Sequence, residues 1–329
     1  KFTITLFDNK IVDIEPSDTT KDNYGLAIDI GTTTIAVYLM SLYDGRQIDV
    51  ISEVNNQRNY GADVISRINY TIENPDGLKK LKVSIVSQIN DIVKNIGKRN
   101  NINIDNIYDT VIVGNTTMIH LLLGIDPEYI AKAPYISGFT EAMNFSPKDI
   151  GFSFKSNISI MPGVSSYVGS DITAGILSSG MLESEKYSLL LDLGTNGEMA
   201  LGNKDEVITC STAAGPAFEG ANIKYGVGGI LGAISEIDLS KKNKIKTIGN
   251  KPPCGVCGSG VLDAVSEMIK YSLIDETGRM FDEEDDDFEF EEYEYLTKDL
   301  VEIDGMKQYI LAKDQNGDII SFTQKDIRE

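Results

Sequence analysis

The chain has 329 residues, of which 41% are hydrophobic, and its 50 acidic residues outnumber its 30 lysines and arginines to give a net charge of −20. At roughly 150 residues per domain, this length predicts two domains that can each bury a core. So acidic a surface repels nucleic acid and anionic membrane, and we expect neither as a partner. No apolar run is long enough to span a membrane, and three cysteines are too few for a disulfide framework, so we expect a cytoplasmic protein.

Residues 1–24 contain a predicted strand pair, KFTITLFDNKIVDIEP, followed by a polar link. We interpret them as a linker region after a preceding module, because the chain starts at Lys1 rather than Met. Lobe one is predicted to span residues 25–180. It opens with three apolar runs separated by turn residues, which is typical of a β-meander. Helical periodicity from Asp63 to Lys98, broken at Pro75, predicts two helices.

The next elements of lobe one are a strand and a helix. Residues 110–115 predict a buried strand, and the following TTMIHLLLG predicts a helix closed by Gly124. His120 falls at helical spacing among apolar residues, so we interpret it as a packed core residue. Asn115 ends the strand, where it is a candidate for a binding cleft or a cap of the helix. A helix is predicted from Ser165 to Ser179, and its small residues would let helices approach closely.

Lobe two is predicted to span residues 181–329. It opens with a second strand, turn and strand, and Pro216 stands well placed at a first helical position. A Gly-rich loop at 254–260 then runs into an amphipathic helix. The acidic run from Asp282 to Glu294 favours a solvated loop or edge strand over a metal site, and Asp314–Asp318 favours a hairpin turn over a calcium loop.

Two copies of one short pattern carry the chemistry: Asp29-Ile-Gly-Thr-Thr-Thr34 and Asp192-Leu-Gly-Thr-Asn-Gly-Glu198. Each copy stands at the end of an apolar run. A strand that carries Asp, a tight Gly turn and a return strand with hydroxyls can present N–H groups to a phosphate while the carboxylate faces a hydrated cation. For either copy alone we favour a plain hairpin turn, in which Gly supplies a positive φ and Asp an Asx-type hydrogen bond. The pair predicts a duplicated fold whose halves close on the phosphates of a nucleotide.

In both halves the chain resembles the superfamily of actin, the sugar kinases and the heat-shock chaperone ATPases. The resemblance implies an α/β, two-lobed actin-like ATPase fold with duplicated βββαβα cores, in which Asp29 and Asp192 face each other across a shared cleft. It also implies that the helix from Ser165 to Ser179 connects the two lobes. The adenosine-binding Gly-Gly element of that superfamily has no counterpart after the Gly-Ser-Gly loop. We therefore expect the second lobe to be C-terminally truncated, or completed by another chain.

Four segments narrow the resemblance to the ATPase portion of the reductive activators of corrinoid proteins: VGNTTMIHLLLGIDPEYIAKAPY (113–135), DLGTNGEMAL (192–201), STAAGPAFEGANI (211–223) and CGVCGSGVLDAV (254–265). That family implies ATP hydrolysis coupled to one-electron reduction of a Co(II) corrinoid to Co(I). It also implies a corrinoid protein as partner, and a homodimer is one assembly that we consider. Members usually carry an N-terminal [2Fe-2S] ferredoxin domain that supplies the electron. This chain lacks the four-cysteine run of such a domain, so we expect it not to be redox-competent alone.

The resemblance implies roles for particular residues. Asp29 and Asp192 are expected to hold Mg²⁺ through its waters, and Glu198 and Glu219 are candidates to orient an attacking water. Phosphate contacts are expected from Gly31, Thr32, Thr33, Thr34, Gly194, Thr195, Asn196 and Gly197. The helix start at Gly258, Ser259 and Gly260 suits an anion or a ribose hydroxyl, with Asp263 as ribose partner, and equally suits plain capping by Ser259.

Alternatives remain open at this stage. Cys254 and Cys257 form a C-x₂-C pair that resembles the [4Fe-4S] site of the activators of 2-hydroxyacyl-CoA dehydratases, although we favour two small buried side chains beside a Gly loop. A small-molecule kinase would use the same two phosphate hairpins with an acidic base. A filament-forming actin relative is a further alternative.

Overall fold

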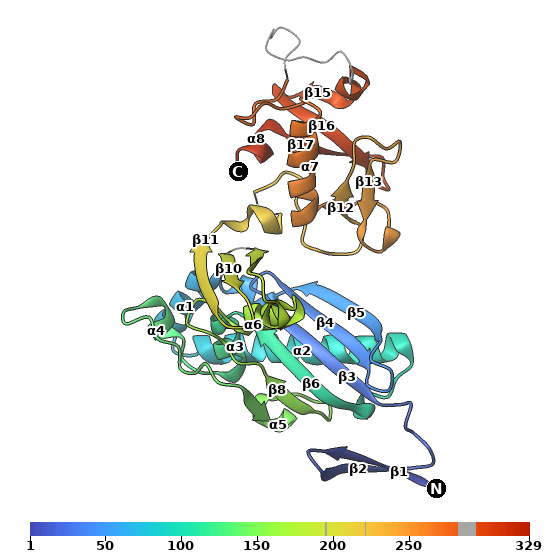
Figure 1. Ribbon diagram of the computed structural model, residues 1–329, viewed down its shortest axis with the longest axis vertical. Helices are drawn as coiled ribbons and strands as arrows, with labels where there is room; N and C mark the ends of the chain where they lie inside the picture. The colour runs from blue at the N-terminus through green and yellow to red at the C-terminus, as the bar shows by residue number, and fades with distance from the viewer. Residues whose placement is uncertain (195, 221, 282–293) are drawn as a thin grey trace. The chain divides into compact units, whose positions relative to one another are not determined.

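The structure, a computed structural model, describes residues 1–194, 196–220, 222–281 and 294–329 (Figure 1), without the side chains of Pro216, Glu219 and Glu294. The acidic run predicted as a loop or edge strand therefore lies almost wholly outside the described residues. The chain forms two compact units. The first comprises Lys1–Leu191 and Glu198–Ser211, and the second comprises Asp192–Gly197 and Thr212–Glu329.

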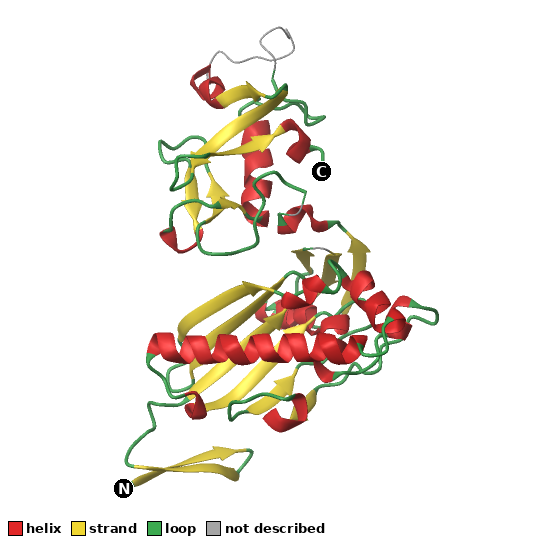
Figure 2. Cartoon of the chain, turned by 180° about the vertical axis from the view of Figure 1, so that it is seen from behind, coloured by secondary structure: helices red, strands yellow, loops and turns green. Residues whose placement is uncertain are grey.

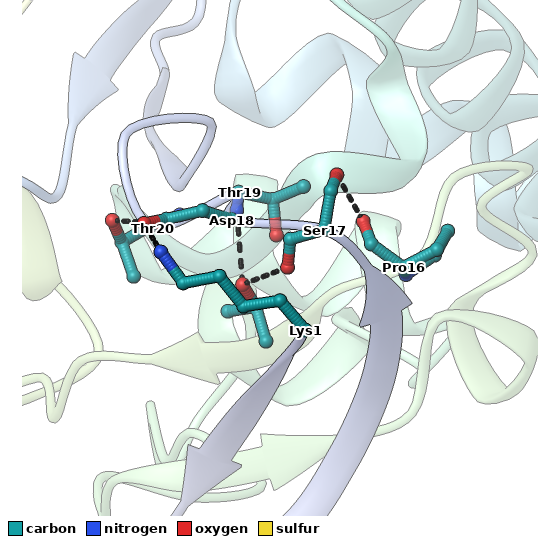
Figure 3. A network of polar contacts seen from close by, with 7 residues as sticks. Lys1, Pro16, Ser17, Asp18, Thr19 and Thr20 are labelled. Carbon is teal, nitrogen blue, oxygen red and sulfur yellow. Dashed lines mark hydrogen bonds and ion pairs between the residues drawn. The ribbon is translucent and has the colours of Figure 1, made fainter.

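The predicted strand pair at the start of the chain is confirmed. Strands β1 (Phe2–Phe7) and β2 (Lys10–Pro16) are antiparallel, and the turn between them places Asp8 and Asn9 at positive φ. A polar network closes the open end of this hairpin (Figure 3). In it, Lys1 Nζ lies 3.0 Å from Asp18 Oδ2 and the Thr19 N–H donates to Thr3 Oγ1 over 2.9 Å. The hydrogen bond from Lys1 lowers the pKa of Asp18 to about 2.

A six-stranded sheet is the centre of the first unit. Its strands are β3 (Tyr24–Ile30), β4 (Thr34–Ser41), β5 (Gln47–Val54), β6 (Ile107–Gly114), β7 (Met143–Phe145) and β8 (Asn157–Ile160), in the order β5-β4-β3-β6-β8-β7. Strands β3, β6 and β8 are parallel, whereas β4, β5 and β7 run antiparallel to their neighbours. The predicted meander and the predicted buried strand are both confirmed. The carboxyl ends of β3, β6 and β8 therefore meet at one edge of the sheet.

Helices cover both faces of this sheet. The long helix α2 (Gly77–Asn100) crosses one face (Figure 2), with α1 (Val64–Glu73) and α3 (Thr116–Leu123) beside it, and α6 (Ser170–Ser178) lies on the other (Figure 1). The break predicted at Pro75 is confirmed, and α3 ends at Gly124 in the left-handed conformation. Shorter helical turns are η1 (Asn56–Asn59), η2 (Ile104–Asn106), α4 (Glu128–Ala131), α5 (Pro147–Ile150) and η3 (Met181–Glu183).

Helix α6 begins five residues later than the sequence pattern predicts. The backbone N–H groups of Val164 and Ser165 both donate to the carbonyl of Val168, at 2.9 and 3.0 Å, so this stretch forms a turn in place of a first helical turn. Gly175 on α6 does allow a close approach, as expected of a small residue. A Cβ there would lie 3.0 Å from Leu190 of β9, so the partner is a strand.

The core of the first unit forms between apolar faces whose residues repeat at strand spacing in β4 and at helix spacing in α2. Strand β4 buries every second residue, and α2 buries residues three and four apart, so both present one apolar face. The side chains that meet between the sheet and α2 include Ile35, Val37, Leu39, Leu81, Ile85, Ile89 and Ile92, all fully buried. This packing fixes the strand ends that carry the candidate site.

A second, three-stranded sheet contains the repeated motif. It has the order β11-β10-β9, from β9 (Ser188–Leu193), β10 (Asn196–Gly202) and β11 (Val207–Ala213), as the repeated strand, turn and strand predicts. A small apolar cluster joins it to α6, through Val168, Ile172, Ile176, Met181 and Ala200, with Leu190 and Val207 against them.

The second unit has its own core. Its elements are η4 (Pro216–Glu219), β12 (Ala233–Ile237), β13 (Ile245–Thr247), η5 (Ile248–Asn250), β14 (Gly255–Val256), α7 (Gly258–Lys270), η6 (Glu294–Asp299), β15 (Leu300–Ile303), β16 (Met306–Lys313), β17 (Ile319–Thr323) and α8 (Gln324–Ile327). The strands form two sheets, β13-β12-β14 and β15-β16-β17. The predicted turn at Asp314 is confirmed, because its Oδ1 accepts from the N–H groups of Asn316 and Asp318 at 2.8 and 2.9 Å.

Among the residues that the structure describes, no helix combines the length and the apolar character needed to cross a bilayer.

Candidate functional site

Three backbone segments converge at the edge where the parallel strands end. Gly114 closes β6 and approaches β3 so closely that a Cβ would lie 2.7 Å from the Ile30 carbonyl oxygen. Gly169, just before α6, approaches Gly114 in turn, with a Cβ position 2.5 Å from the Gly114 carbonyl oxygen. Ser170 Oγ accepts from the Gly114 N–H over 3.1 Å. A side chain at either glycine would overlap a backbone carbonyl oxygen, so the three segments pack closely at this edge.

The first copy of the repeated motif forms a tight turn at this edge. The Gly31 N–H donates to the Thr34 carbonyl over 3.0 Å, and a Cβ on Gly31 would lie only 2.7 Å from that oxygen. Gly31 does not adopt a positive φ. The glycine is therefore required by the close approach of two backbone segments, and the plain-turn interpretation gave the wrong reason for it.

Asp29 and the three threonines of the turn differ in exposure. The Asp29 side chain is exposed on β3, whereas its neighbours Ile28 and Ile30 are buried on the opposite face. Thr32 is only 5% exposed, and its Oγ1 accepts from Asn115 Nδ2 over 2.9 Å. Thr33 and Thr34 are half-buried. The hydroxyl of Thr32 thus serves as a structural tie, which the sequence pattern does not indicate.

Asn115 links the turn to α3. Its Oδ1 accepts from the Met118 N–H over 3.0 Å, so the predicted capping of the helix is confirmed. Its Nδ2 donates to Thr32 at the same time. The Asn115 side chain therefore both caps α3 and holds the turn of the candidate site.

Two buried residues behind the turn were not predicted from the sequence. Asn55 follows β5, and Arg67 lies in α1; neither is exposed to solvent. Asn55 Nδ2 donates to the Gly31 carbonyl over 2.9 Å, and Arg67 Nη2 donates to the Thr32 carbonyl over 2.6 Å. The sequence signal for a buried Arg67 is its place next to the apolar Ile68 in a helix. This signal is weak, because arginine side chains in helices usually reach solvent.

The second copy of the motif forms a shorter turn. The Gly194 N–H donates to the Asn196 carbonyl over 2.9 Å, one residue nearer than the equivalent bond of the first copy. Asp192 is exposed near the end of β9, Gly197 is buried, and Glu198 is buried in β10 with 8% exposure. Thr195 and the Glu219 side chain lie outside the described residues, so their predicted roles stay predictions.

The loop before α7 is held by contacts other than a side-chain cap of the helix. Ser259 Oγ donates to the Ser235 carbonyl over 2.9 Å, and α7 has Cys257 at its N-cap without a side-chain bond, so capping by Ser259 is wrong. Gly258 and Gly260 permit close packing, because a Cβ on either would overlap the Phe218 or the Ile234 carbonyl oxygen. Asp263 Oδ2 accepts from the Ile237 N–H over 3.0 Å. One carboxylate oxygen of the predicted ribose partner is thus bonded to β12.

The two cysteines of the C-x₂-C pair both donate to carbonyls. Cys257 Sγ lies 3.3 Å from the Ile234 oxygen, and Cys254 Sγ lies 3.7 Å from the Leu231 oxygen. Desolvation raises the pKa of the Cys254 thiol. Protonated thiols are poor metal ligands. Within the described ranges, no three His, Cys, Asp or Glu side chains gather as a metal site. The favoured interpretation of two buried side chains is confirmed for Cys257 and wrong for Cys254, which is exposed.

His120 is a fully buried side chain of α3. Its Nε2 accepts from the Gly138 N–H over 2.9 Å, so the ring proton must be on Nδ1, which donates to the Thr116 carbonyl over 2.7 Å. The ring stacks on Phe139 at 4.5 Å. Burial lowers the pKa of His120, which keeps the ring neutral. The prediction of a packed core residue is confirmed.

The described residues fit a nucleotide and its cation. Asp29 supplies a carboxylate of the kind that binds hydrated Mg²⁺, and the turn after β3 supplies backbone N–H groups of the kind that bind phosphate. The buried side chains of Asn55 and Arg67 fill the space behind the turn, so a polar ligand has to approach it from the other side.

Two known protein families match almost the whole chain. Residues 24–184 match the family described as the RACo middle region, and residues 186–329 match the C-terminal domain of RACo, the ASKHA domain. The two matches together include all of the chain except residues 1–23 and Glu185. An ASKHA domain has a mixed α/β, actin-like fold and implies ATP binding.

Individual relatives agree with these matches. Corrinoid activation enzyme RamQ from Eubacterium limosum is 38% identical over 274 residues, which are 82% of this chain and 46% of that protein. The [Co(II) methylated amine-specific corrinoid protein] reductase from Methanosarcina barkeri is 24% identical over 77% of this chain and 52% of its own length. The solved structure of a reductive activator for corrinoid, iron-sulfur protein superimposes with a TM-score of 0.83 at 36% identity, covering 99% of this chain and 52% of that one.

The chain thus spans about half the length of the relatives that it matches. Its first unit contains the whole matched middle region, and its second unit lies within the matched ASKHA domain. The sequence matches and the superposition agree along almost the whole chain, and on these grounds the chain belongs to the RACo family.

Proposed function

We propose that this chain is the ATP-binding portion of a reductive activator, which couples ATP hydrolysis to one-electron reduction of a Co(II) corrinoid to Co(I). The observation that carries the proposal is the edge of the sheet where β3 and β6 end, which brings Asp29 and the Gly31–Thr34 turn beside Asn115. The names of the similar proteins support the choice of corrinoid chemistry over other uses of ATP.

Each predicted residue has a proposed task. Asp29 and Asp192 hold Mg²⁺ through its waters, since Mg²⁺ keeps most of its hydration shell and prefers one or two carboxylates with phosphate oxygens. The amides of the two turns bind the phosphates, and Glu198 or Glu219 orients the attacking water. ATP, when bound, supplies the free energy of hydrolysis that makes the transfer of a low-potential electron to cobalt favourable.

The electron donor that we propose is a [2Fe-2S] domain outside residues 1–329. The electron acceptor is the cobalt of a partner corrinoid protein. One electron enters Co(II) and gives Co(I), so the redox step balances without oxidation of this chain. We also propose that residues 1–24 form a linker hairpin, that residues 25–180 and 181–329 are the two ATPase lobes, and that the whole protein acts as a homodimer.

Steady-state ATP hydrolysis tests this function. The rate is measured for the protein with Mg²⁺, first alone, then with a Co(II) corrinoid protein, and then with sugars and short-chain acids. Stimulation by the corrinoid protein alone is the expected result. ATP consumption that follows a small-molecule acceptor, with appearance of its phosphate ester, would identify a kinase and contradict the proposal.

A further inference from the structure

The turn after β3 has an unusual pattern of backbone hydrogen bonds. Its three successive carbonyls, those of Gly31, Thr32 and Thr33, accept from Asn55 Nδ2 at 2.9 Å, from Arg67 Nη2 at 2.6 Å and from the Asn55 N–H at 2.8 Å. In an extended strand, successive carbonyls point to opposite sides. Here two residues bind all three of them.

Asn55 and Arg67 form one buried cluster behind the turn. Both lie near Gln57 Oε1, Asn55 Nδ2 at 3.4 Å and Arg67 Nη1 at 3.5 Å. Both also contact Met118 Sδ, at 3.9 and 3.1 Å respectively. Since the two donors share these neighbours, the three carbonyls that they bind all face the same side of the turn.

The direction of the carbonyls fixes the direction of the amides. In a trans peptide, each carbonyl and the N–H of the next residue point in opposite directions. The N–H groups of Thr32, Thr33 and Thr34 are therefore turned away from the cluster of Asn55 and Arg67. Successive N–H groups that point to one side form a concave nest, which binds anions.

Arg67 adds an electrostatic effect. The peptide whose oxygen it binds, that of Thr32, also carries the Thr33 N–H. A charge-assisted hydrogen bond on the carbonyl polarises the whole peptide and makes its N–H a stronger donor. The buried guanidinium thus acts on a bound anion through the backbone, without touching it.

We infer that Arg67 and Asn55 are positioning residues that orient the amides of residues 32–34 toward the phosphates of the nucleotide. The inference rests on the proposed function, since it takes ATP as the ligand of this turn. Part of the phosphate affinity of the motif then comes from Arg67, a buried arginine that lies far from the motif in the sequence.

Calorimetric titration of the protein with MgATP tests the inference. Arg67→Ala removes the bond to Thr32, and we expect MgATP affinity to fall about tenfold or more. Arg67→Lys restores the charge and one donor, so it should recover part of the affinity. Free guanidinium ion added to the Arg67→Ala protein should do the same, and it should not strengthen MgATP binding by the wild type.

Two control variants separate positioning from general effects. Arg58→Ala removes an equally charged but exposed side chain on η1, and Ile92→Ala destabilises the core of α2 without touching the turn. Both should bind MgATP like the wild type. If Arg67→Ala fails to fold, Arg67→Lys provides the test, because it should itself bind MgATP several-fold more weakly than the wild type. Wild-type affinity in the folded Arg67 variants overturns the inference alone, whereas a wild type that does not bind MgATP overturns the proposed function.

Discussion

Asn115 Nδ2 donates to Thr32 Oγ1 over 2.9 Å, and this bond joins the ends of two adjacent parallel strands, β6 and β3. The two residues are far apart in the sequence, yet parallel pairing brings them to the same edge of the sheet. Because Asn115 also caps α3, the helix, the strand end and the turn are held by one amide.

Asn115 variants should separate these two functions. Asn115→Ala removes the cap and the tie to Thr32, so the free energy of unfolding should fall by about 1–2 kcal/mol. Asn115→Ser keeps a capping hydroxyl but is too short to hold Thr32, so it should cost less stability. Urea denaturation measures both. Calorimetry with MgATP should show weaker binding in both variants, and normal binding by Asn115→Ser would mean that the tie has no part in the site.

Gly31 should not tolerate a side chain. Alanine there would place its Cβ 2.7 Å from the Thr34 carbonyl oxygen, so the turn must open. We expect Gly31→Ala to lower the free energy of unfolding by about 1–3 kcal/mol and to weaken phosphate binding. Gly163→Ala is the matched control, because its Cβ would have no neighbour nearer than 3.6 Å. Equal stability of the two variants in thermal unfolding would refute the close-approach explanation.

His120 should make the stability of the protein depend on pH. Burial holds its folded-state pKa below the ordinary value of 6.5. Above pH 6.5 neither state binds the proton and its contribution to stability is complete. As pH falls below that value the unfolded chain gains a proton that the folded state does not, so the free energy of unfolding falls by up to about 1.4 kcal/mol per pH unit.

The comparison of wild type with His120→Gln isolates this effect, since the sequence has a single histidine. Urea unfolding of both proteins is measured at about pH 7.5 and about pH 5.5. The variant should lose less stability on acidification than the wild type. Parallel losses would show that the His120 ring is as easily protonated in the folded protein as in the unfolded chain.

The sequence was informative where local pattern decides structure. The alternating apolar residues of β4, the break at Pro75 and the left-handed Gly124 each follow from chemistry within a few residues. The start of α6 could not be predicted in this way. The prediction started this helix at Ser165, where the backbone instead forms a turn through the Val168 carbonyl.

The parts of the site that come from distant segments were also beyond the sequence pattern. Asn55 and Arg67 reach the turn only because the fold places the end of β5 and the helix α1 behind it. Likewise, Ser259 reads as a cap, but the packing of α7 on β12 gives its hydroxyl a better acceptor at Ser235. Tertiary contacts of this kind leave no local periodic signal in a single sequence.

The central claim is that Asp29 and the Gly31–Thr34 turn bind the phosphates of ATP with its Mg²⁺. Calorimetric titration with ATP, in excess Mg²⁺ and then in excess EDTA, tests it on the wild type and on Asp29→Asn. Asp44→Asn, an exposed change in the loop between β4 and β5, serves as the control. We predict that Mg²⁺ strengthens ATP binding about ten- to a hundredfold in the wild type and in the control, and has little effect in Asp29→Asn. An Asp29→Asn protein that keeps the full response to Mg²⁺ would contradict the account.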